Sequence, residues 1–463
     1  MATIKLGKEP GVYSQEEINP ALAITQARLK VAGLVGHSTP TLTVSNIAVI
    51  RGTGEADTLD YAFTNVEKIL SISDYLNANG TNLPQYATDD YTLEQGEDKK
   101  ATIKWAGDTK PTEGNTYYVN AVIKKDVSYY VPKKFADAAS VKAYYGPEWY
   151  TKEDGTKVVN EISLAARLMF NNGANEIWIC EAALGSNGQP SEENIKNAIT
   201  LLDDIELQSI VVTYMTKTIQ DFLKTRVVID SATENQRERV GFVCALSDEV
   251  DAIVTQSSGL KEQRIVNVAP SQVTVIAEDN QGNANEFTVS STFAAAACVG
   301  ALVDNSRPVS MPLTRFTPVG IYGVSKVYTR PEIEKLSAAG TFVIKERDNN
   351  VLVNQSVTTD NTNQNNRELS VVLIKDEVLK DLRYNLDRDY IGKYFNRKTT
   401  PTKIKTSIVN ILTSYLDTLI EDFDESNIIV TPDGEDTTRV NVRLAFSVLR
   451  PLNYIYISFQ VVI

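Results

Sequence analysis

Residues 439–463 constrain the fold of this chain more than any other segment. Apolar and polar residues alternate over residues 440–448, which is the period of a half-buried β-strand. Pro451 interrupts the pattern, because proline has no N–H to donate to a neighbouring strand. The alternation then resumes, and one face carries Ile455, Ile457, Phe459 and Val461. Because chain ends are usually polar and poorly ordered, this apolar end predicts a strand that pairs either with its own sheet or with another subunit's, and both alternatives stay open.

The composition describes an ordinary globular protein. With 463 residues, of which 42% are hydrophobic and 23% charged, the chain has room for about three domains. The formal net charge of −13 argues against a nucleic-acid partner. No apolar run reaches the roughly 18 residues of a membrane-spanning helix, and the N-terminus lacks the apolar segment of a signal peptide. We therefore expect no membrane insertion.

The cysteines and the histidine exclude several kinds of site. Cys180, Cys244 and Cys298 stand singly in apolar surroundings, which predicts buried free thiols made in a reducing compartment rather than disulfides or metal ligands. His37 is the single histidine of the sequence, so catalytic triads and histidine-based metal sites are excluded. Its place in a Gly-His-Ser-Thr-Pro segment predicts a solvated loop.

No motif for enzymatic chemistry is convincing. Gly33-Leu-Val-Gly36 lacks the third glycine of a dinucleotide-binding loop and the Gly-Lys-Ser/Thr of a P-loop, and Gly52-Thr-Gly54 is better interpreted as a turn. Acidic clusters at residues 89–90, 203–204 and 421–425 would suit a divalent cation or glycosidase-like chemistry. Solvated helix ends and loops explain them more simply. We expect no enzyme, no cofactor and no bound metal.

The first third of the chain predicts an arm and a β-rich insertion. Pro10-Gly11 and Asn19-Pro20 oppose a helix, so residues 1–25 predict an extended arm with apolar footholds such as Val12 and Tyr13. The apolar spacing of residues 65–78 predicts a helix. Residues 86–131, with strand-like pieces at 101–105 and 116–123, predict a small all-β insertion domain.

Residues 26–85 and 132–335 predict an α/β middle domain. Helical patterns, among them residues 161–172, 219–224 and 233–239, separate short apolar strands. This alternation favours a mostly parallel sheet covered on both faces. The strands are predicted at residues 31–36, 176–180, 209–214, 241–246 and 264–268.

An α+β domain is predicted over residues 336–448, followed by a terminal strand over 449–463. It contains an amphipathic segment, residues 371–394, and a helix predicted over residues 402–423. One basic run stands out in this acidic chain: Lys393, Arg397, Lys398, Lys403 and Lys405. It is either a solvated face or an electrostatic contact to an acidic partner.

Several passages together resemble the tail sheath proteins of contractile phage tails and related injection machines. They are PGVY at residues 10–13, IKWAGDTKPTEGNTYYVNAVI at 103–123, ISLAARLMFNNGANEIWICEA at 162–182, LSAAGTFVI at 336–344, RELSVVLIKDEVLKDLRYNLDRDYIGKYFNR at 367–397, and the terminal strands. No one of them is a strict motif, and their order and spacing carry the resemblance.

The resemblance implies a structural subunit that forms a helical cylinder around an inner tube and contracts. The C-terminal domain would be completed by Pro10, Gly11, Val12 and Tyr13 of one neighbour and by the terminal strand of another, a form of β-augmentation. Its implied partners are further copies of itself, the inner tail tube protein, and the baseplate and tail terminator proteins. The implied locations are the host cytoplasm during assembly and then a virion tail or a released contractile particle.

We predict that the basic run contacts the tube. Two other functions stay open, a non-contractile tube-forming protein and an α/β enzyme that uses acidic residues.

Overall fold

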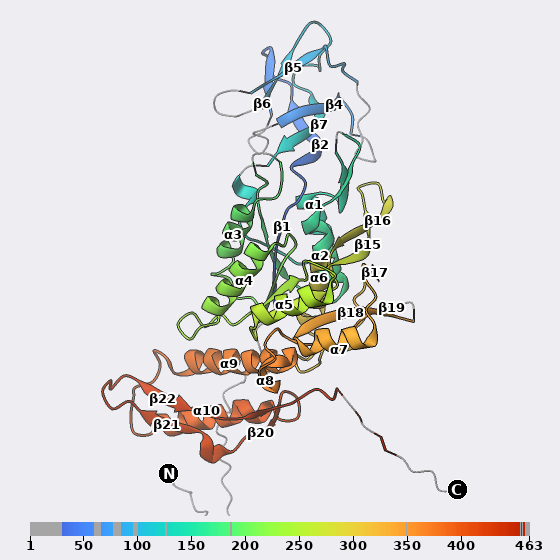
Figure 1. The fold of residues 1–463 in the computed structure, drawn as a ribbon. Coiled ribbons are helices and arrows are strands. Elements are labelled where there is room, and N and C mark those ends of the chain that lie inside the picture. The colour runs from blue at the N-terminus through green and yellow to red at the C-terminus, as the bar shows by residue number, and fades with distance from the viewer. Residues whose placement is uncertain are drawn as a thin grey trace, which may run out of the picture. The chain divides into compact units, whose positions relative to one another are not determined.

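The computed structural model describes residues 30–59, 66–76, 85–95, 101–125, 127–152, 154–185, 188–348, 350–453, 455, 457 and 458. Within them the chain divides into two compact units. The larger contains Lys30–Val372 and the described residues from Pro451 onward, and the smaller contains Leu373–Arg450 (Figure 1). The predicted N-terminal arm, with Pro10, Gly11, Val12 and Tyr13, lies outside the described residues, as do Phe459 and Val461.

The larger unit is built on a sheet with the strand order β19-β18-β14-β13-β12-β1-β11-β8. Its parallel strands are β1 (Ala32–Gly36), β11 (Ile177–Glu181), β12 (Ser209–Val212), β13 (Val240–Cys244), β14 (Ile265–Ala269) and β18 (Thr341–Arg347). Antiparallel β8 (Lys133–Phe135) and β19 (Asn350–Val353) form its edges. The predicted α/β fold is confirmed, because these apolar runs are buried almost throughout, as a sheet covered on both faces requires.

Helices pack against this sheet. They are α1 (Ala138–Tyr145), α2 (Glu161–Asn171), α3 (Glu192–Leu201), α4 (Lys217–Asp230), α5 (Val250–Leu260), α6 (Thr292–Leu302) and α7 (Arg330–Ala338). Apolar side chains of α3 and α4 share one core cluster with strands β1, β11, β12 and β13. Ser191 caps α3, since its side chain accepts a hydrogen bond from the backbone N–H of Asn194.

Helix α6 is buried on every side and packs closely against α2. A Cβ added at Gly300 of α6 would lie 2.2 Å from the backbone oxygen of Met169 in α2. Because only glycine lacks that atom, Gly300 is what permits the two helix backbones to approach.

The β-rich part of the larger unit begins before residue 86. One sheet contains β2 (Thr41–Ile50), β7 (Thr116–Lys124) and β4 (Val66–Ser73), and another contains β3 (Ala56–Thr58), β6 (Ala101–Trp105) and β5 (Tyr91–Gln95). They share an apolar core. Inside it the Asp57 carboxylate accepts hydrogen bonds from Trp105 Nε1 at 2.8 Å and from the Tyr117 hydroxyl at 3.0 Å, and it pairs with Arg51.

The helix predicted over residues 65–78 is wrong, because residues 66–73 form strand β4, paired antiparallel with β7. The pairing shifts register twice, between Val66 and Lys68 and between Ile69 and Ser71. Each shift adds a residue to one side of the ladder. The buried positions therefore no longer follow a period of two, and their spacing resembles that of a helix.

Short elements complete the larger unit. They are η2 (Val127–Tyr129), β9 (Trp149–Thr151), β10 (Lys157–Val159), β15 (Gln272–Glu278), β16 (Ala284–Ser290), β17 (Ile321–Val324) and α8 (Gln364–Arg367). β15 and β16 form an antiparallel hairpin, with Val273 opposite Val289. The helix predicted over residues 233–239 is wrong: these residues form turns and extended chain. There Arg239 donates hydrogen bonds to the backbone oxygens of Leu202 and Ile205.

The smaller unit combines helices with short strands. They are the part of α9 (Leu369–Tyr390) from Leu373 onward, α10 (Thr400–Ser414), β20 (Ile420–Asp422), η3 (Glu425–Asn427), β21 (Ile429–Pro432), β22 (Val440–Arg443) and β23 (Ser447–Val448). The Tyr390 hydroxyl lies 2.7 Å from Ser407 Oγ and joins α9 to α10. β21 pairs with β22, and β20 pairs with β23.

Some boundaries differ from the sequence interpretation. α10 ends at Ser414 rather than at residue 423, and the strand predicted over residues 440–448 is divided into β22 and β23, which pair with different partners. The sequence predicted a C-terminal domain over residues 336–448. Residues 341–347 instead form β18 of the central sheet, next to β14. The reason is that β18 finds its parallel partner more than seventy residues earlier in the chain.

Candidate interaction surfaces

His37 lies in the interior of the larger unit, where polar groups of other elements hold it by hydrogen bonds. His37 is 5% exposed and its Nδ1 lies 2.8 Å from the backbone oxygen of Ala182, so the predicted solvated loop is wrong. The reason is its position just after β1, where the backbone N–H of His37 is bound by Glu161 Oε2 at 3.0 Å. Nearby, Lys125 pairs with Glu181 at 2.7 Å, and both side chains are buried.

Gly33, Gly36 and the acidic cluster at residues 203–204 have structural explanations. A Cβ at Gly33 would lie 2.7 Å from Leu207 Cδ1, and one at Gly36 would lie 2.2 Å from Thr213 Oγ1, so both glycines make room for packing. Asp203 pairs with Arg226. In the described part of the chain no group of three His, Cys, Asp or Glu side chains could hold a metal ion. None of the helices described is long and apolar enough to cross a membrane.

Cys180, Cys244 and Cys298 are buried and free, as predicted. Burial raises the pKa of the Cys244 thiol to about 11 and the pKa of the Cys180 and Cys298 thiols to about 12. All three groups therefore remain protonated near neutral pH, and protonated thiols are poor nucleophiles.

A group of cations lies between α9 and α10 and on the first turns of α10. We call this group the basic segment; it consists of Lys393, Arg397, Lys398, Lys403 and Lys405. None of these cations lies within 4 Å of a carboxylate in the described part of the chain, and the first four are exposed. Aromatic side chains lie among them: Lys403 Nζ is 5.1 Å from the ring centre of Tyr394, and the Arg397 guanidinium is 5.5 Å from that of Phe395. Phe395 is 77% exposed. The basic segment is thus a solvent-facing surface of cations and aromatic rings.

The described residues after Pro451 remain outside any strand. Ile455 is 74% exposed and Ile457 is 82% exposed, so these two residues of the predicted apolar face are not covered by the described part of the subunit. Before them, Asn453 donates a hydrogen bond of 3.0 Å to Glu368 Oε1. This bond attaches Asn453, which precedes the alternating segment, to the larger unit.

The short sheets of the smaller unit have open edges. In the described part of the chain β21 and β22 pair with each other, and β20 and β23 pair with each other, so each strand has one neighbour. The other edge of each strand leaves backbone N–H and C=O groups for a further strand.

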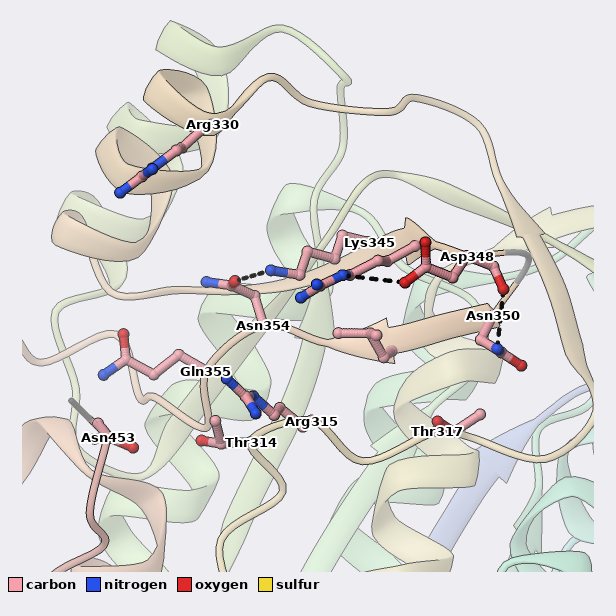
Figure 2. Close-up of a pocket in the computed structure, with 12 residues that line it drawn as sticks. Thr314, Arg315, Thr317, Arg330, Lys345, Asp348, Asn350, Asn354, Gln355 and Asn453 are labelled. Carbon is pink, nitrogen blue, oxygen red and sulfur yellow. Dashed lines mark hydrogen bonds and ion pairs between the residues drawn. The ribbon is translucent and has the colours of Figure 1, made fainter. Parts of the chain in front are cut away.

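A pocket of about 720 Å³ in the larger unit gathers cationic side chains, and we call it the cationic pocket (Figure 2). It is lined by Arg315, Arg330, Lys345 and Arg347, one carboxylate (Asp348), and the polar residues Thr314, Thr317, Asn350, Asn354, Gln355 and Asn453. Sequence reasoning missed this site because its cations are scattered and form no run. The pairing of β18 with β19 brings residues 345 and 352 together, and no local pattern marks it.

Comparisons with known proteins agree with this architecture. Residues 361–462 match the family model of the phage tail sheath C-terminal domain. Over 345 residues, 73% of this chain, the sequence is 26% identical to the tail sheath protein of Mycobacterium phage Bxz1. The match covers 57% of that relative, so the chain spans little more than half of its length.

Solved structures share the fold over nearly the whole chain. The helical sheath of the anti-feeding prophage in its contracted state aligns with a TM-score of 0.58 at 14% identity, covering 98% of this chain and 99% of that one. A chain of the baseplate of the same particle gives 0.60 at 14% identity, covering 99% and 100%. The contracted sheath complex of the extracellular contractile injection system PVC gives 0.55 at 12% identity, covering 99% and 98%.

The fold is therefore that of the subunits of contractile sheaths. More particularly, residues 361–462 match the model of the phage tail sheath C-terminal domain, and the predicted resemblance to tail sheath proteins is confirmed.

Proposed function

We propose that this chain is the structural subunit of a contractile tail sheath. It polymerises as a helical cylinder around an inner tube and contracts from a metastable extended state, which drives the tube through a target cell envelope. The shared fold and the match of residues 361–462 support this function. The observation that carries it is the uncovered apolar alternation of Ile455 and Ile457 in a subunit whose short sheets have open edges.

The terminal segments link neighbouring subunits. Residues 449–463, through Ile455, Ile457, Phe459 and Val461, add a strand to the C-terminal domain of one neighbour. Residues 1–25, through Pro10, Gly11, Val12 and Tyr13, do the same for another. A strand of about ten residues adds roughly five net hydrogen bonds at about 1 kcal/mol each, and buried apolar surface adds to this.

Such linkers permit contraction without dissociation. The folded units move as rigid bodies while the linking strands keep their pairing. If the rearrangement buries roughly 400 Å² more apolar surface per subunit, it releases on the order of 10 kcal/mol before the costs of ordering and desolvation. Repeated over many identical subunits, this energy moves the tube.

The basic segment contacts the inner tail tube protein in the extended state. Its cations lack carboxylate partners in the described part of the subunit and surround exposed aromatic rings, a combination that suits an acidic protein surface. The two ends of the cylinder meet the baseplate and the tail terminator proteins. The subunit assembles in the host cytoplasm and then resides in a virion tail or a released contractile particle.

Electron microscopy of the purified chain tests the proposal. We expect helical cylinders from the full chain. Removal of residues 454–463, or their replacement by a Gly/Ser segment of equal length as the matched control, should leave a folded monomer. Cylinders formed by both variants would contradict the linking role. A full chain that stays a monodisperse monomer favours the enzyme alternative, and tubes of a single fixed width and length favour a non-contractile protein.

A further inference from the structure

The cationic pocket lies apart from the basic segment, and Asn453 is the one lining residue that belongs to the linking segment 449–463. Two of the pocket's four cations are paired with carboxylates, Arg330 with Glu334 and Arg347 with Asp348, whereas Arg315 and Lys345 are not. Figure 2 shows Arg315, Lys345 and Asn354 around one hollow. Lys345 Nζ donates to Asn354 Oδ1 at 2.6 Å, a neutral acceptor. The Arg315 guanidinium has no hydrogen-bond or ion-pair partner in the described part of the chain. Two cations therefore face the same space without an anion between them.

The pKa of Lys345 reflects these neighbouring positive charges. Burial lowers the pKa of Lys345, and the neighbouring charges of Arg347 and Arg315 lower it further. Like charges held together cost free energy, and an anion placed among them would remove that cost. In a chain of net charge −13 such a concentration of cations is a localised exception.

The form of the pocket favours a macromolecular partner over a small anion. Its rim is open to solvent, since the side chains of Arg330 and Arg347 are 91% and 65% exposed. Small ligands are usually held in sites that bury most of their surface. A neighbouring protein instead brings its own bulk and excludes water from the contact.

The chain itself carries a matching anionic surface, Glu421, Asp422, Asp424 and Glu425, which we call the acidic segment. All four are exposed, and none lies within 4 Å of a cation in the described residues. Two other acidic regions contain ion pairs: Asp204 pairs with Arg237, and Asp433 pairs with Arg439. Hydrogen bonds from Ser426 and, to a smaller extent, the charge of Lys405 lower the pKa of Asp424, so this carboxylate stays anionic. The acidic segment therefore offers a group of carboxylates that would complement the cationic pocket.

We propose that in the assembled sheath the cationic pocket of one copy binds the acidic segment of another copy. This inference rests on the proposed function, because a polymer is what brings the two surfaces of different copies together. Arg315 and Lys345 would pair with two of the carboxylates, and Asn350, Asn354 and Gln355 would supply hydrogen bonds.

Charge reversal with mixing tests the contact. One variant carries Arg315→Glu and Lys345→Glu, and the other carries Glu421→Lys, Asp422→Lys and Glu425→Lys. Each alone places like charges at the contact, so we expect at least a tenfold higher protein concentration for assembly. An equimolar mixture should assemble again, because every pocket then finds a complementary segment on the other variant. Circular dichroism checks folding, and Arg315→Gln with Lys345→Gln replaces the first variant if it does not fold.

A peptide of residues 418–428 provides a second measurement on the full-length wild-type chain below its assembly concentration. We expect binding that weakens with added salt, and at least tenfold weaker binding of a control peptide with Gln and Asn in place of the four acids. Equal binding of both peptides, or displacement by inorganic phosphate as effective as by the acidic peptide, overturns the proposal.

The outcomes separate the two hypotheses. Wild-type cylinders together with unchanged assembly of both reversed variants overturn this inference alone. Recovery in one chain carrying all five reversals, without recovery in the mixture, shows a contact within a copy and also overturns it. A wild-type chain that never polymerises contradicts the proposed function, and the peptide measurement then decides whether the pocket still recognises the acidic segment.

Discussion

The hydroxyl of Tyr415 donates a hydrogen bond of 2.9 Å to Asp381 Oδ2, and this bond joins the residue after α10 to the middle of α9. Asn385 Nδ2 donates to the other carboxylate oxygen of Asp381 at 2.9 Å. Asp381 is 4% exposed, so this small network is a polar contact within the core of the smaller unit.

Tyr415→Phe should lower the free energy of unfolding of the smaller unit by about 1 kcal/mol or more, because one buried carboxylate oxygen loses its donor. Tyr394→Phe is the matched control, since Tyr394 is 47% exposed and should change stability little. Urea unfolding of the soluble chain measures both. Equal effects of the two substitutions would contradict the role given to the bond.

The same network should make stability depend on pH. Burial raises the pKa of Asp381, and this effect exceeds the opposite effects of the bonds from Tyr415 and Asn385. The folded state therefore holds the proton more tightly than the unfolded chain. The resulting stabilisation is complete below the pKa of the unfolded chain, near 4, and is lost as pH rises through the raised value.

Asp381→Asn removes this ionisation, so its unfolding free energy should fall less than that of the wild type between pH 4 and pH 7. The difference between the two profiles isolates Asp381 from the other titrating groups. A constant difference across this range would show that the carboxyl group titrates alike in the folded and unfolded states.

Gly300→Ala should destabilise the larger unit by about 3 kcal/mol, because the new methyl group meets the backbone of Met169, which cannot rotate away. Gly259→Ala in α5 is the control. No atom lies within 4 Å of its Cβ position, and alanine should stabilise that helix by up to about 1 kcal/mol. Thermal unfolding of both variants measures the contrast, and similar shifts in the two would contradict the close packing of α2 and α6.

Ile455→Ser with Ile457→Ser should impair assembly without changing the stability of the subunit, because both side chains are solvent-exposed in the described structure. Burial of each isoleucine in a neighbour is worth about 1.5–3 kcal/mol, so the concentration needed for assembly should rise by about a hundredfold or more. Sedimentation measures assembly, and Val127→Ser, which lies outside the linking segment 449–463 and is 83% exposed, is the control. A loss of thermal stability in the double variant would indicate that the isoleucines pack within their own subunit.

Lys398→Glu, Lys403→Glu and Lys405→Glu together should uncouple the sheath from the tube while the chain still assembles with itself. Co-purification with the inner tube protein measures this effect, and Lys68→Glu, Lys110→Glu and Lys224→Glu in the larger unit are the matched control. Unchanged co-assembly would exclude the basic segment from the tube contact.

Local sequence patterns predicted the elements whose residues carry their own signals. Ser191 capped its helix, and the continuous apolar runs formed the parallel strands, because capping and burial act over a few neighbouring residues. β4 was mistaken for a helix because two register shifts displaced its buried residues. His37 was taken for a loop residue because Glu161 and Ala182, which enclose it, lie far away in the sequence.

The interaction surfaces also differ in whether the sequence alone predicts them. The basic segment and the terminal alternation are continuous in sequence and could be named in advance. The cationic pocket joins Arg315 to Lys345 through the fold alone. The partner of Ile455 and Ile457 could not be derived from one chain. A strand that pairs with another subunit has the same alternating sequence pattern as a strand that pairs within its own subunit.

The buried cysteines have a consequence for durability. Under the proposed function, the particle is made inside a cell and then released, so it passes from a reducing medium into an oxidising one, where accessible thiolates become cross-linked or oxidised. Cys180, Cys244 and Cys298 present no reactive sulfur at the surface. These three cysteines should therefore keep the same covalent state in both media. A proposed sheath in its extended state would not be altered by oxidation at these positions.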